Sequence, residues 1–152
     1  MSNRTIALRP ATDENRAALE ALRVGPEQIR FVGSVADAFL EAEEEPDGRG
    51  IQFGLYDGDT LVGFVMLSDE VGNPSYVAHY LWKLFIDERF QGQGYGTAAV
   101  DLVADYFRSR GVDTMWTSAS EGDGSPVGFY ERYGFVRQGT TSWGEVMFRF
   151  DL

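Results

Sequence analysis

Apolar runs separated by polar turn residues mark three strands in the first half of the chain. The first run ends at Pro10, and the other two flank Asp57-Gly58-Asp59, in which Asp-Gly is a strong hairpin signal. Thr12-Asp13 and Ser34 are suitable N-caps for two helices between the first strand and the hairpin. We expect strands over residues 6–10, 51–56 and 61–67, helices over residues 14–22 and 36–44, and an irregular segment at 24–32.

The second half of the chain alternates strands with helices. Ala99, Val103 and Phe107 recur at the spacing of one helix face, and Gly111 is a suitable stop for that helix. This order, with an antiparallel first half and a βαβ crossover in the second, predicts a mixed α/β fold. We expect strands over residues 77–86 and 112–119, helices over residues 97–110 and 126–133, and a last strand with Val146, Phe148 and Phe150 on one face.

A glycine-rich stretch, Arg89-Phe90-Gln91-Gly92-Gln93-Gly94-Tyr95-Gly96, joins the predicted strand 77–86 to the predicted helix 97–110. Glycines at alternate positions let the backbone turn sharply and present N–H groups, and the helix adds the positive end of its dipole. This context predicts a cradle for a phosphate or pyrophosphate. The stretch lacks the lysine of a Walker A loop, and its G-x-G-x-G spacing differs from the G-x-G-x-x-G of dinucleotide-binding folds.

The composition narrows the classes of function. The 152 residues are 43% hydrophobic, which suits a single domain, residues 1–152, with its own core. Because the chain has no cysteine and one histidine, His79, disulfides and a thiol nucleophile are excluded and no metal is expected. No apolar run approaches the roughly 20 residues of a membrane span, and residues 1–10 lack a signal-peptide core, so we expect a soluble, cytoplasmic protein.

Acidic residues outnumber basic ones, 24 to 13, and the net charge of −11 favours cationic ligands over nucleic acid or anionic membranes. Six of the eleven residues from Asp37 to Asp47 are acidic. On a helix, Asp37, Glu41, Glu44 and Glu45 fall on one side, where a cationic ligand would relieve their repulsion. A solvated helix face is the alternative explanation of this cluster. The alternative explanation of the net charge is that acidic residues keep the protein soluble.

Two segments about 35 residues apart carry motifs that support each other. Gln91, Gly94 and Gly96 form a Q-x-x-G-x-G pattern, and residues 129–135 read Phe-Tyr-x-x-x-Gly-Phe. Both motifs resemble those of the GCN5-related N-acetyltransferases, the GNAT family, and the order of elements agrees over nearly the whole chain. The resemblance implies a GNAT fold, with a mixed central sheet of about six to seven strands and about four helices. It also implies acetyl-CoA as the co-substrate and allows a homodimer.

The same resemblance implies roles for individual residues. Tyr130 would lie near the cofactor sulfur and act as a general acid toward the departing thiolate, which suits a phenol with a pKa near 10; simple packing in the core is the alternative. The family often has an asparagine where this chain has Asp123, and an acid suits an anionic cofactor less, so that contact is not carried over. The cofactor would contact the strand at Leu84, Phe85 and Ile86 and the loop at Gln91, Gly92, Gln93, Gly94, Tyr95, Gly96 and Thr97.

A bound amine can attack a thioester once it is neutral, so the reaction also needs a proton acceptor. His79 has a suitable intrinsic pKa, although a lone histidine is as often structural, and a Glu or Asp acting through water is equally open. Strand alternation places His79 and Lys83 on one face and Trp82 on the other, unless a bulge intervenes.

Finer similarity concerns the acceptor. Residues 25–32, 62–64 and 81–87 resemble the spermine/spermidine acetyltransferase branch of GNATs, with Lys83 where that branch more often has arginine. Because that branch acetylates primary amines of polyamines and often lines its acceptor cleft with an acidic second helix, the resemblance implies a small cationic amine as partner, at Glu41, Glu44, Glu45 and Trp82. The alternatives are an aminoglycoside, a protein N-terminus, an amino-acid-like amine or a non-catalytic acyl-CoA-binding domain.

Overall fold

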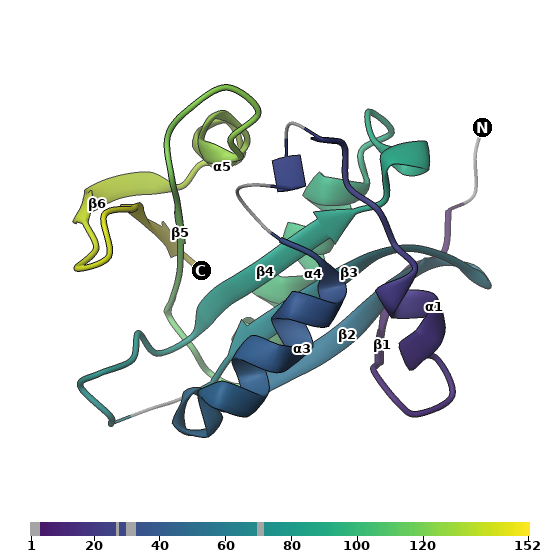
Figure 1. Ribbon diagram of the computed structural model, residues 1–152. Coiled ribbons are helices and arrows are strands. Elements are labelled where there is room, and N and C mark those ends of the chain that lie inside the picture. Colours follow the sequence, from purple (N-terminus) through teal and green to yellow (C-terminus); the bar gives the residue numbers. More distant parts are fainter. Residues whose placement is uncertain (1–3, 27, 30–32, 70–71) are drawn as a thin grey trace.

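The computed structural model describes residues 4–26, 28–29, 33–69 and 72–152. Strands and helices alternate broadly in the predicted order (Figure 1). The strands are β1 (Ile6–Pro10), β2 (Gly50–Asp57), β3 (Thr60–Ser68), β4 (Tyr80–Ile86), β5 (Thr114–Ala119), β6 (Val136–Thr140) and β7 (Val146–Asp151). The helices are α1 (Arg16–Glu20), α3 (Val35–Glu44), α4 (Tyr95–Arg108) and α5 (Val127–Tyr133), with short 3₁₀ turns at Pro46–Gly48 and Glu88–Phe90.

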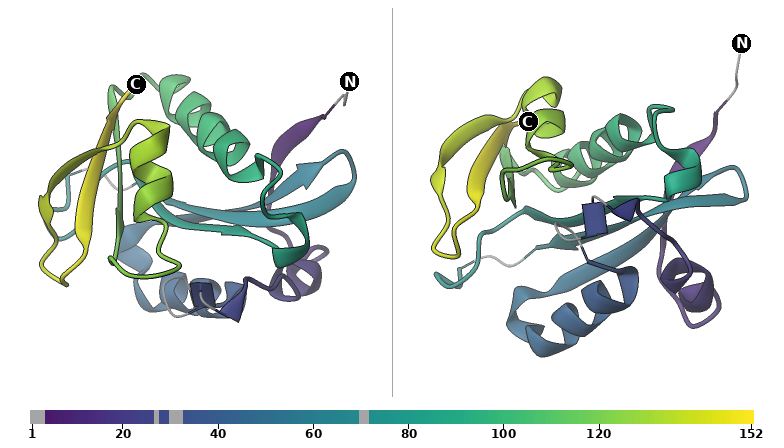
Figure 2. Two further views of the ribbon diagram at one scale, coloured as in Figure 1. Left: turned by 90° about the horizontal axis from the view of Figure 1, so that it is seen from above. Right: turned by 45° about the horizontal axis from the view of Figure 1, so that its top comes forward.

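The described strands form one mixed sheet in the order β1-β2-β3-β4-β5-β7-β6. All neighbouring pairs are antiparallel except β4 and β5, which are parallel and joined through α4. Helices α1 and α3 cover one face of the sheet and α4 covers the other (Figures 1 and 2). The prediction of a mixed α/β fold with six to seven strands and about four helices is therefore confirmed.

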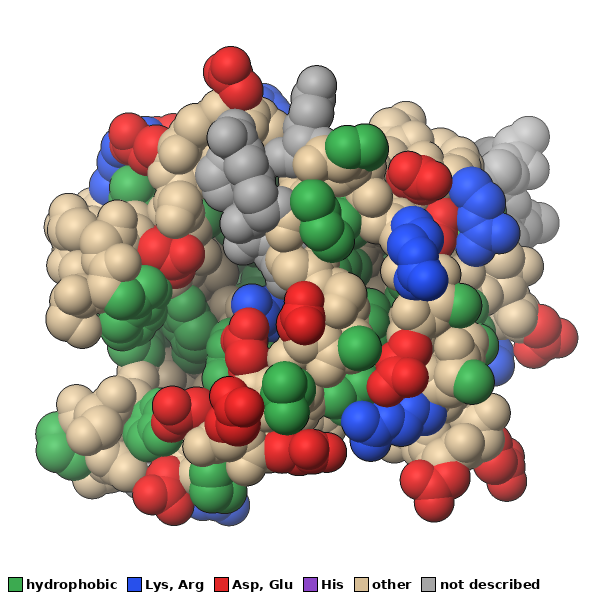
Figure 3. Space-filling model, in the orientation of Figure 1, with side chains coloured by type: hydrophobic (Ala, Val, Ile, Leu, Met, Phe, Trp, Pro, Cys, Tyr) green, Lys and Arg blue, Asp and Glu red, His purple; other side chains and the backbone are tan. Residues whose placement is uncertain are grey.

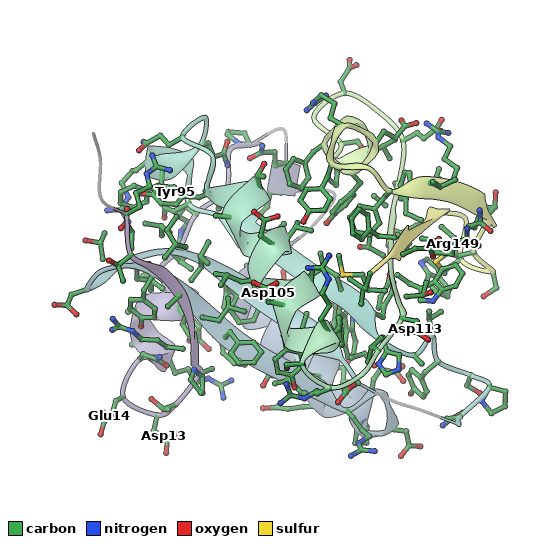
Figure 4. All side chains as sticks on the ribbon, turned by 180° about the vertical axis from the view of Figure 1, so that it is seen from behind. Asp13, Glu14, Tyr95, Asp105, Asp113 and Arg149 are labelled. Carbon is green, nitrogen blue, oxygen red and sulfur yellow. The ribbon has the colours of Figure 1, made fainter. Side chains whose placement is uncertain are left out.

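The sheet separates two apolar clusters, one on each face. The larger cluster packs α4 and α5 against the sheet through residues such as Val103, Phe107 and Phe148. The smaller cluster packs α1 and α3 against it through Leu19, Phe39 and other buried side chains. Burial of these apolar side chains, at about 25 cal/mol per Å², is the main favourable contribution to folding, and it fixes α4 across the back of the sheet (Figure 4).

Several predicted boundaries differ from the structure. The predicted strand 77–86 begins only at Tyr80, because His79 has a φ of 56°, in the left-handed region, which interrupts an extended backbone. Helix α4 begins two residues before the predicted start at Thr97, directly after Gly94. Helix α1 is shorter than the predicted 14–22, and its N-cap is Asn15 rather than Thr12-Asp13. In the segment 24–32, expected to be irregular, residues 27 and 30–32 lie outside the described residues.

A bulge in β4 changes which side chains share a face. Met66 pairs with Lys83 and Leu67 with Leu81, so Trp82 is an extra residue in β4. Leu81 and Leu84 therefore pack against the α4 cluster, whereas Trp82 packs against the α3 cluster, and strict alternation fails at this point. Bulges re-aim side chains in this way and are common beside active sites.

Strands β4 and β5 stay together for only two pairs of residues. Tyr80 pairs with Trp116 and Leu81 with Thr117, and the hydroxyl of Thr117 donates to the carbonyl of Leu81 at 2.9 Å. Beyond these pairs the two strands carry no further ladder, and β5 leaves β4 in the ribbon view (Figure 1). Because these two parallel neighbours move apart, a space opens between them in the middle of the sheet.

No helix in the described ranges is long and apolar enough to cross a membrane.

Candidate active site

A first cavity, of about 570 Å³, lies where β4 and β5 have separated. We call it cavity 1. The end of β4, the glycine loop, the start of α4 and one side of α5 contribute to its wall. Of the residues predicted to contact a cofactor, nine line it: Leu84, Ile86, Gln91, Gly92, Gly94, Tyr95, Gly96, Thr97 and Tyr130. The lining also includes Gln28, Phe129 and Arg132.

The glycine loop directs the N-terminus of α4 into cavity 1. Gly94 is the N-cap with a φ of 84°, no side chain caps the helix, and no acidic residue occupies its first turn. The first N–H groups of an α-helix have no partner inside the helix, so they remain available to an anion. Gly96 allows α4 to approach α5, since an added Cβ would lie 3.3 Å from ring atoms of Phe129. Tyr95, labelled in Figure 4, marks this end of the helix.

A buried carboxylate holds the loop in place. Asp87, only 2% exposed, follows β4 and accepts hydrogen bonds from the backbone N–H of Arg23 at 3.0 Å and from the backbone N–H and Nε of Arg89 at 3.0 and 2.8 Å. Burial alone would raise the pKa of Asp87, but the bonds from Arg89 and Arg23 outweigh it and lower the pKa. Gln91 donates to the carbonyl of Ile86 at 3.0 Å and so ties the loop back to the end of β4.

A second cavity, of about 500 Å³, lies on the α3 side of the same opening, and we call it cavity 2. Glu41, Glu45, Lys83 and Glu145 line it, so its charged side chains give a formal charge of −2. Lys83 Nζ lies 3.2 Å from Glu41 Oε1, and the hydroxyl of Tyr76 donates to Glu45. Trp82 and Trp143 add aromatic surface to the wall. In the space-filling view, acidic side chains gather over α3 beside a hollow in this face (Figure 3).

Tyr130 lies at the junction of the two cavities. Three residues, Leu84, Pro126 and Tyr130, line both of them. The ring of Tyr130 packs against Phe129, Phe135 and Phe148, and its side chain is buried. Burial raises the pKa of Tyr130 to about 12, a hydrogen bond with Thr117 opposes this shift, and the charge of Glu145 adds to it. The phenol therefore keeps its proton at neutral pH and can donate it.

Some predicted site residues lie away from the cavities. His79 lines neither of them: its Nδ1 lies 3.2 Å from Asp69 Oδ1, and its ring packs on Phe107. Phe107 is twelve residues beyond Tyr95, which is about 18 Å along α4. Phe85 is buried in the α3 cluster against Phe64, and Gln93 is exposed, with its carbonyl bonded to Arg4.

The acidic residues of α3 do not form one site either. Glu41 and Glu45 line cavity 2, but Glu44 is exposed and lines neither cavity. Asp37 instead completes a capping box with Ser34. Hydrogen bonds with the backbone and the side chain of Ser34 lower the pKa of Asp37. Of the four acids expected on one side of this helix, the structure thus brings Glu41 and Glu45 to cavity 2. Asp123 is exposed and also lies outside both cavity walls.

Two charged residues of the cavity walls were missed by sequence reasoning. Arg132, on α5, lines cavity 1 and forms no ion pair with any described residue. Its position one turn after Gly128 on a helix beside the loop was a usable signal, because residues three and four apart share a helix face. Glu145 lines cavity 2 from the turn between β6 and β7. No sequence signal pointed to Glu145, since its place depends on the pairing of β7 with β5.

Comparisons with known proteins agree with this geometry. Residues 16–135 match the Acetyltransferase (GNAT) family. The chain is 30% identical over 144 residues to the spermine/spermidine N(1)-acetyltransferase of Bacillus subtilis (strain 168), a match that covers 89% of this chain and 90% of the relative.

Solved structures share the fold. The PaiA N-acetyltransferase from Thermoplasma acidophilum, in complex with coenzyme A, matches with a TM-score of 0.66 and 14% identity over 97% of this chain and 99% of that one. A Bacillus subtilis acetyltransferase in complex with CoA matches with a TM-score of 0.67 and 18% identity over 99% of each chain.

Proposed function

Because the chain belongs to the GNAT acetyltransferase family, we propose that it transfers the acetyl group of acetyl-CoA to a primary amine of a polyamine or diamine. The observation that carries this proposal is the meeting of two cavities of opposite character at Tyr130. Cavity 1 offers a helix N-terminus and Arg132, whereas cavity 2 offers three glutamates against one lysine. An anionic donor and a cationic acceptor suit these two cavities in that order.

Cavity 1 fits the anionic part of coenzyme A. The free N–H groups at the start of α4 suit a pyrophosphate, and the positive φ of Gly94 at the N-cap favours glycine in the turn that presents them. Arg132 can pair with a further phosphate. At the other end of cavity 1, β4 no longer pairs with β5 at Leu84 and Ile86. Its backbone N–H and C=O groups on that edge are open to the extended, amide-containing arm of coenzyme A. Acetyl-CoA supplies an acyl group already activated as a thioester.

Tyr130 is the proposed general acid. A thiolate that leaves an acyl carbon needs a proton, and the phenol at the junction of the cavities holds one because burial raises its pKa to about 12. Even a phenol exposed to water has a pKa near 10, which is still above neutral pH. The role therefore depends on position, and removal of the hydroxyl tests it directly.

Cavity 2 suits an acceptor with more than one ammonium group. Its formal charge of −2 attracts cations, and a polyamine can place one ammonium near Tyr130 and another near the α3 glutamates. Trp82 and Trp143 can contact the methylene segments or, through their ring faces, a cation. The Bacillus subtilis relative, which is named for spermine and spermidine, supports the same acceptor class.

An acceptor panel tests this proposal. Thiol release from acetyl-CoA would be followed with spermidine, spermine, simple diamines, an aminoglycoside, an amino acid and an N-terminal peptide. We expect kcat/KM to be highest for polyamines, and turnover with one of the other amines alone would replace the polyamine by that acceptor. Tyr130→Phe should lower kcat by roughly 10- to 100-fold with little change in KM for acetyl-CoA. An unchanged kcat, when chemistry limits turnover, would remove Tyr130 from its role.

A further inference from the structure

A polar network centred on Glu145 lines the side of cavity 2 opposite α3. Glu145 Oε1 accepts hydrogen bonds from Ser118 Oγ at 2.8 Å and Trp143 Nε1 at 2.9 Å, and Oε2 accepts one from Ser120 Oγ at 3.3 Å. The hydroxyl of Tyr80 is hydrogen-bonded to Ser118 and extends the network to β4. Groups from β5, from the residue that follows it and from the turn between β6 and β7 thus converge on one carboxylate.

The backbone of Glu145 is also fixed. Its N–H donates to Thr141 Oγ1 at 2.9 Å, and its carbonyl accepts from the Thr141 N–H at 2.8 Å, which closes the turn between β6 and β7. The next residue, Val146, pairs with Ala119 of β5. The carboxylate is therefore held by strand pairing and by side-chain bonds, and this pre-organises it beside the space where an acceptor would bind.

The charge of Glu145 is not neutralised within the described part of the chain. All three groups that donate to it are neutral, and a carboxylate offers about four acceptor positions, so about one remains for a ligand. Glu41 is different because Lys83 pairs with it, and Glu45 is exposed and bonded to Tyr76. Among the glutamates of cavity 2, Glu145 is the one that combines an open acceptor position with a rigid setting.

We propose that Glu145 is the base that removes a proton from the acceptor ammonium. One N–H bond of the ammonium breaks and an O–H bond forms on Glu145, which leaves a neutral amine with a free lone pair; the proton then passes to solvent. The neutral amine then forms a C–N bond to the acyl carbon as the C–S bond breaks. Tyr130 gives its proton to the departing sulfur, and the second proton that the nitrogen loses returns to the Tyr130 phenolate. This inference rests on the proposed function. The other titratable groups around the cavity are Glu41, Glu45, Tyr76, Tyr80, Lys83 and Tyr130.

Glu145→Gln gives a test with a distinct pH signature. An alkylammonium with a pKa near 10 is neutral in only about one molecule in three hundred at pH 7.5, and the neutral fraction rises about tenfold per pH unit below that pKa. Without its base, the enzyme would depend on this fraction. We therefore expect kcat/KM of the variant to be roughly 100-fold below wild type at pH 7.5, with a gap that narrows several-fold by pH 9.5. An equal gap at both pH values, or no gap, would overturn the proposal.

Glu14→Gln is the matched control. Glu14 is an exposed residue before α1, points away from the body of the molecule in Figure 4 and lines neither cavity. Glu14→Gln should therefore show the same dependence of kcat/KM on pH as the wild type. The acceptor panel with the wild-type enzyme tests the polyamine proposal. The ratio of kcat/KM between Glu145→Gln and wild type tests the role of Glu145 with whichever amine is turned over. Failure of one proposal can therefore be distinguished from failure of the other.

Trp143→Phe provides a second variant that keeps the carboxylate. It removes the indole N–H bond to Glu145 and keeps an aromatic ring, although a smaller one, in the wall of cavity 2; because Trp143 is exposed, folding should be preserved. As a positioning change, it should lower kcat/KM about 3- to 10-fold at pH 7.5, with the same narrowing toward pH 9.5. An effect on KM alone would show that Trp143 contacts the acceptor without aligning the base and would overturn this part of the proposal.

Discussion

Lys83→Met should increase the affinity of cavity 2 for a polycation. Lys83 Nζ lies 3.2 Å from Glu41 Oε1, and its side chain is only 15% exposed, so it neutralises a glutamate of the wall. The substitution changes the formal charge of the cavity from −2 to −3. Methionine keeps much of the apolar stem, and Glu41 stays partly in water, so the free energy of unfolding should change by less than about 1 kcal/mol.

The size of the effect follows from Coulomb's law. For an ammonium about 8 Å from the altered charge and an effective dielectric constant between about 20 and 80, the interaction energy is about 0.5–2 kcal/mol. This energy corresponds to a roughly 2- to 30-fold decrease in KM for the acceptor. Because mobile ions screen such interactions over about 8 Å at physiological ionic strength and about 3 Å at 1 M, the gain should nearly vanish at 1 M salt.

Initial rates with spermidine, at low and at 1 M salt, measure this change. Lys83→Arg keeps the charge and should stay within about twofold of wild type in KM for the acceptor. A monoamine of similar length should gain less than spermidine from Lys83→Met, because it carries fewer charges. A higher KM in Lys83→Met at low salt would refute the reasoning and would mean that Lys83 holds Glu41 in place for the acceptor or contacts the acceptor itself.

The remaining predictions concern stability. Asp87→Asn should lower the free energy of unfolding by about 1–3 kcal/mol in urea, because an amide cannot accept every bond that Arg23 and Arg89 donate, and a loss under 0.5 kcal/mol would contradict this. The pKa of Tyr130, raised by burial to about 12, predicts constant stability from this group below pH 10 and a loss of about 2–3 kcal/mol as pH rises from 10 to 12, since only the unfolded chain loses the proton there. Tyr130→Phe should show a shallower alkaline decline in the same titration.

Local chemistry made much of the fold predictable. Asp57-Gly58 joins β2 to β3, and Ser34 caps α3, as their residue types indicate, because both features depend on neighbours in the sequence. The start of β4 was predicted three residues too early because Val77 to His79 look like strand residues in sequence. His79 instead has a positive φ, and its ring packs against Phe107, which lies 28 residues further along, so neighbouring residues in the sequence do not reveal this contact.

The residues of the candidate site also divide into those that depend on local sequence and those that depend on distant contacts. The glycine loop and Tyr130 were predictable because each lies in a motif whose spacing is local. The bulge at Trp82 and the position of Glu145 were not, since both depend on the register between strands that are distant in sequence. A shift of one residue in that register would turn the side chain of Glu145 to the other face of the sheet. Local sequence thus predicted the residues that line cavity 1 better than those that line cavity 2.

The distribution of charge gives the two cavities a direction. Among the described residues that line cavity 1, none is acidic and Arg132 is basic, although the whole chain carries a net charge of −11. Cavity 2 keeps three glutamates in its wall. Under the proposed function, a polyanionic donor would be repelled from cavity 2 and a polycationic acceptor would gain nothing in cavity 1, so each substrate would be sorted by its charge before any specific contact forms. Both cavities end at Leu84, Pro126 and Tyr130, so in the proposed reaction this sorting would bring the acyl carbon and the amine to the same phenol.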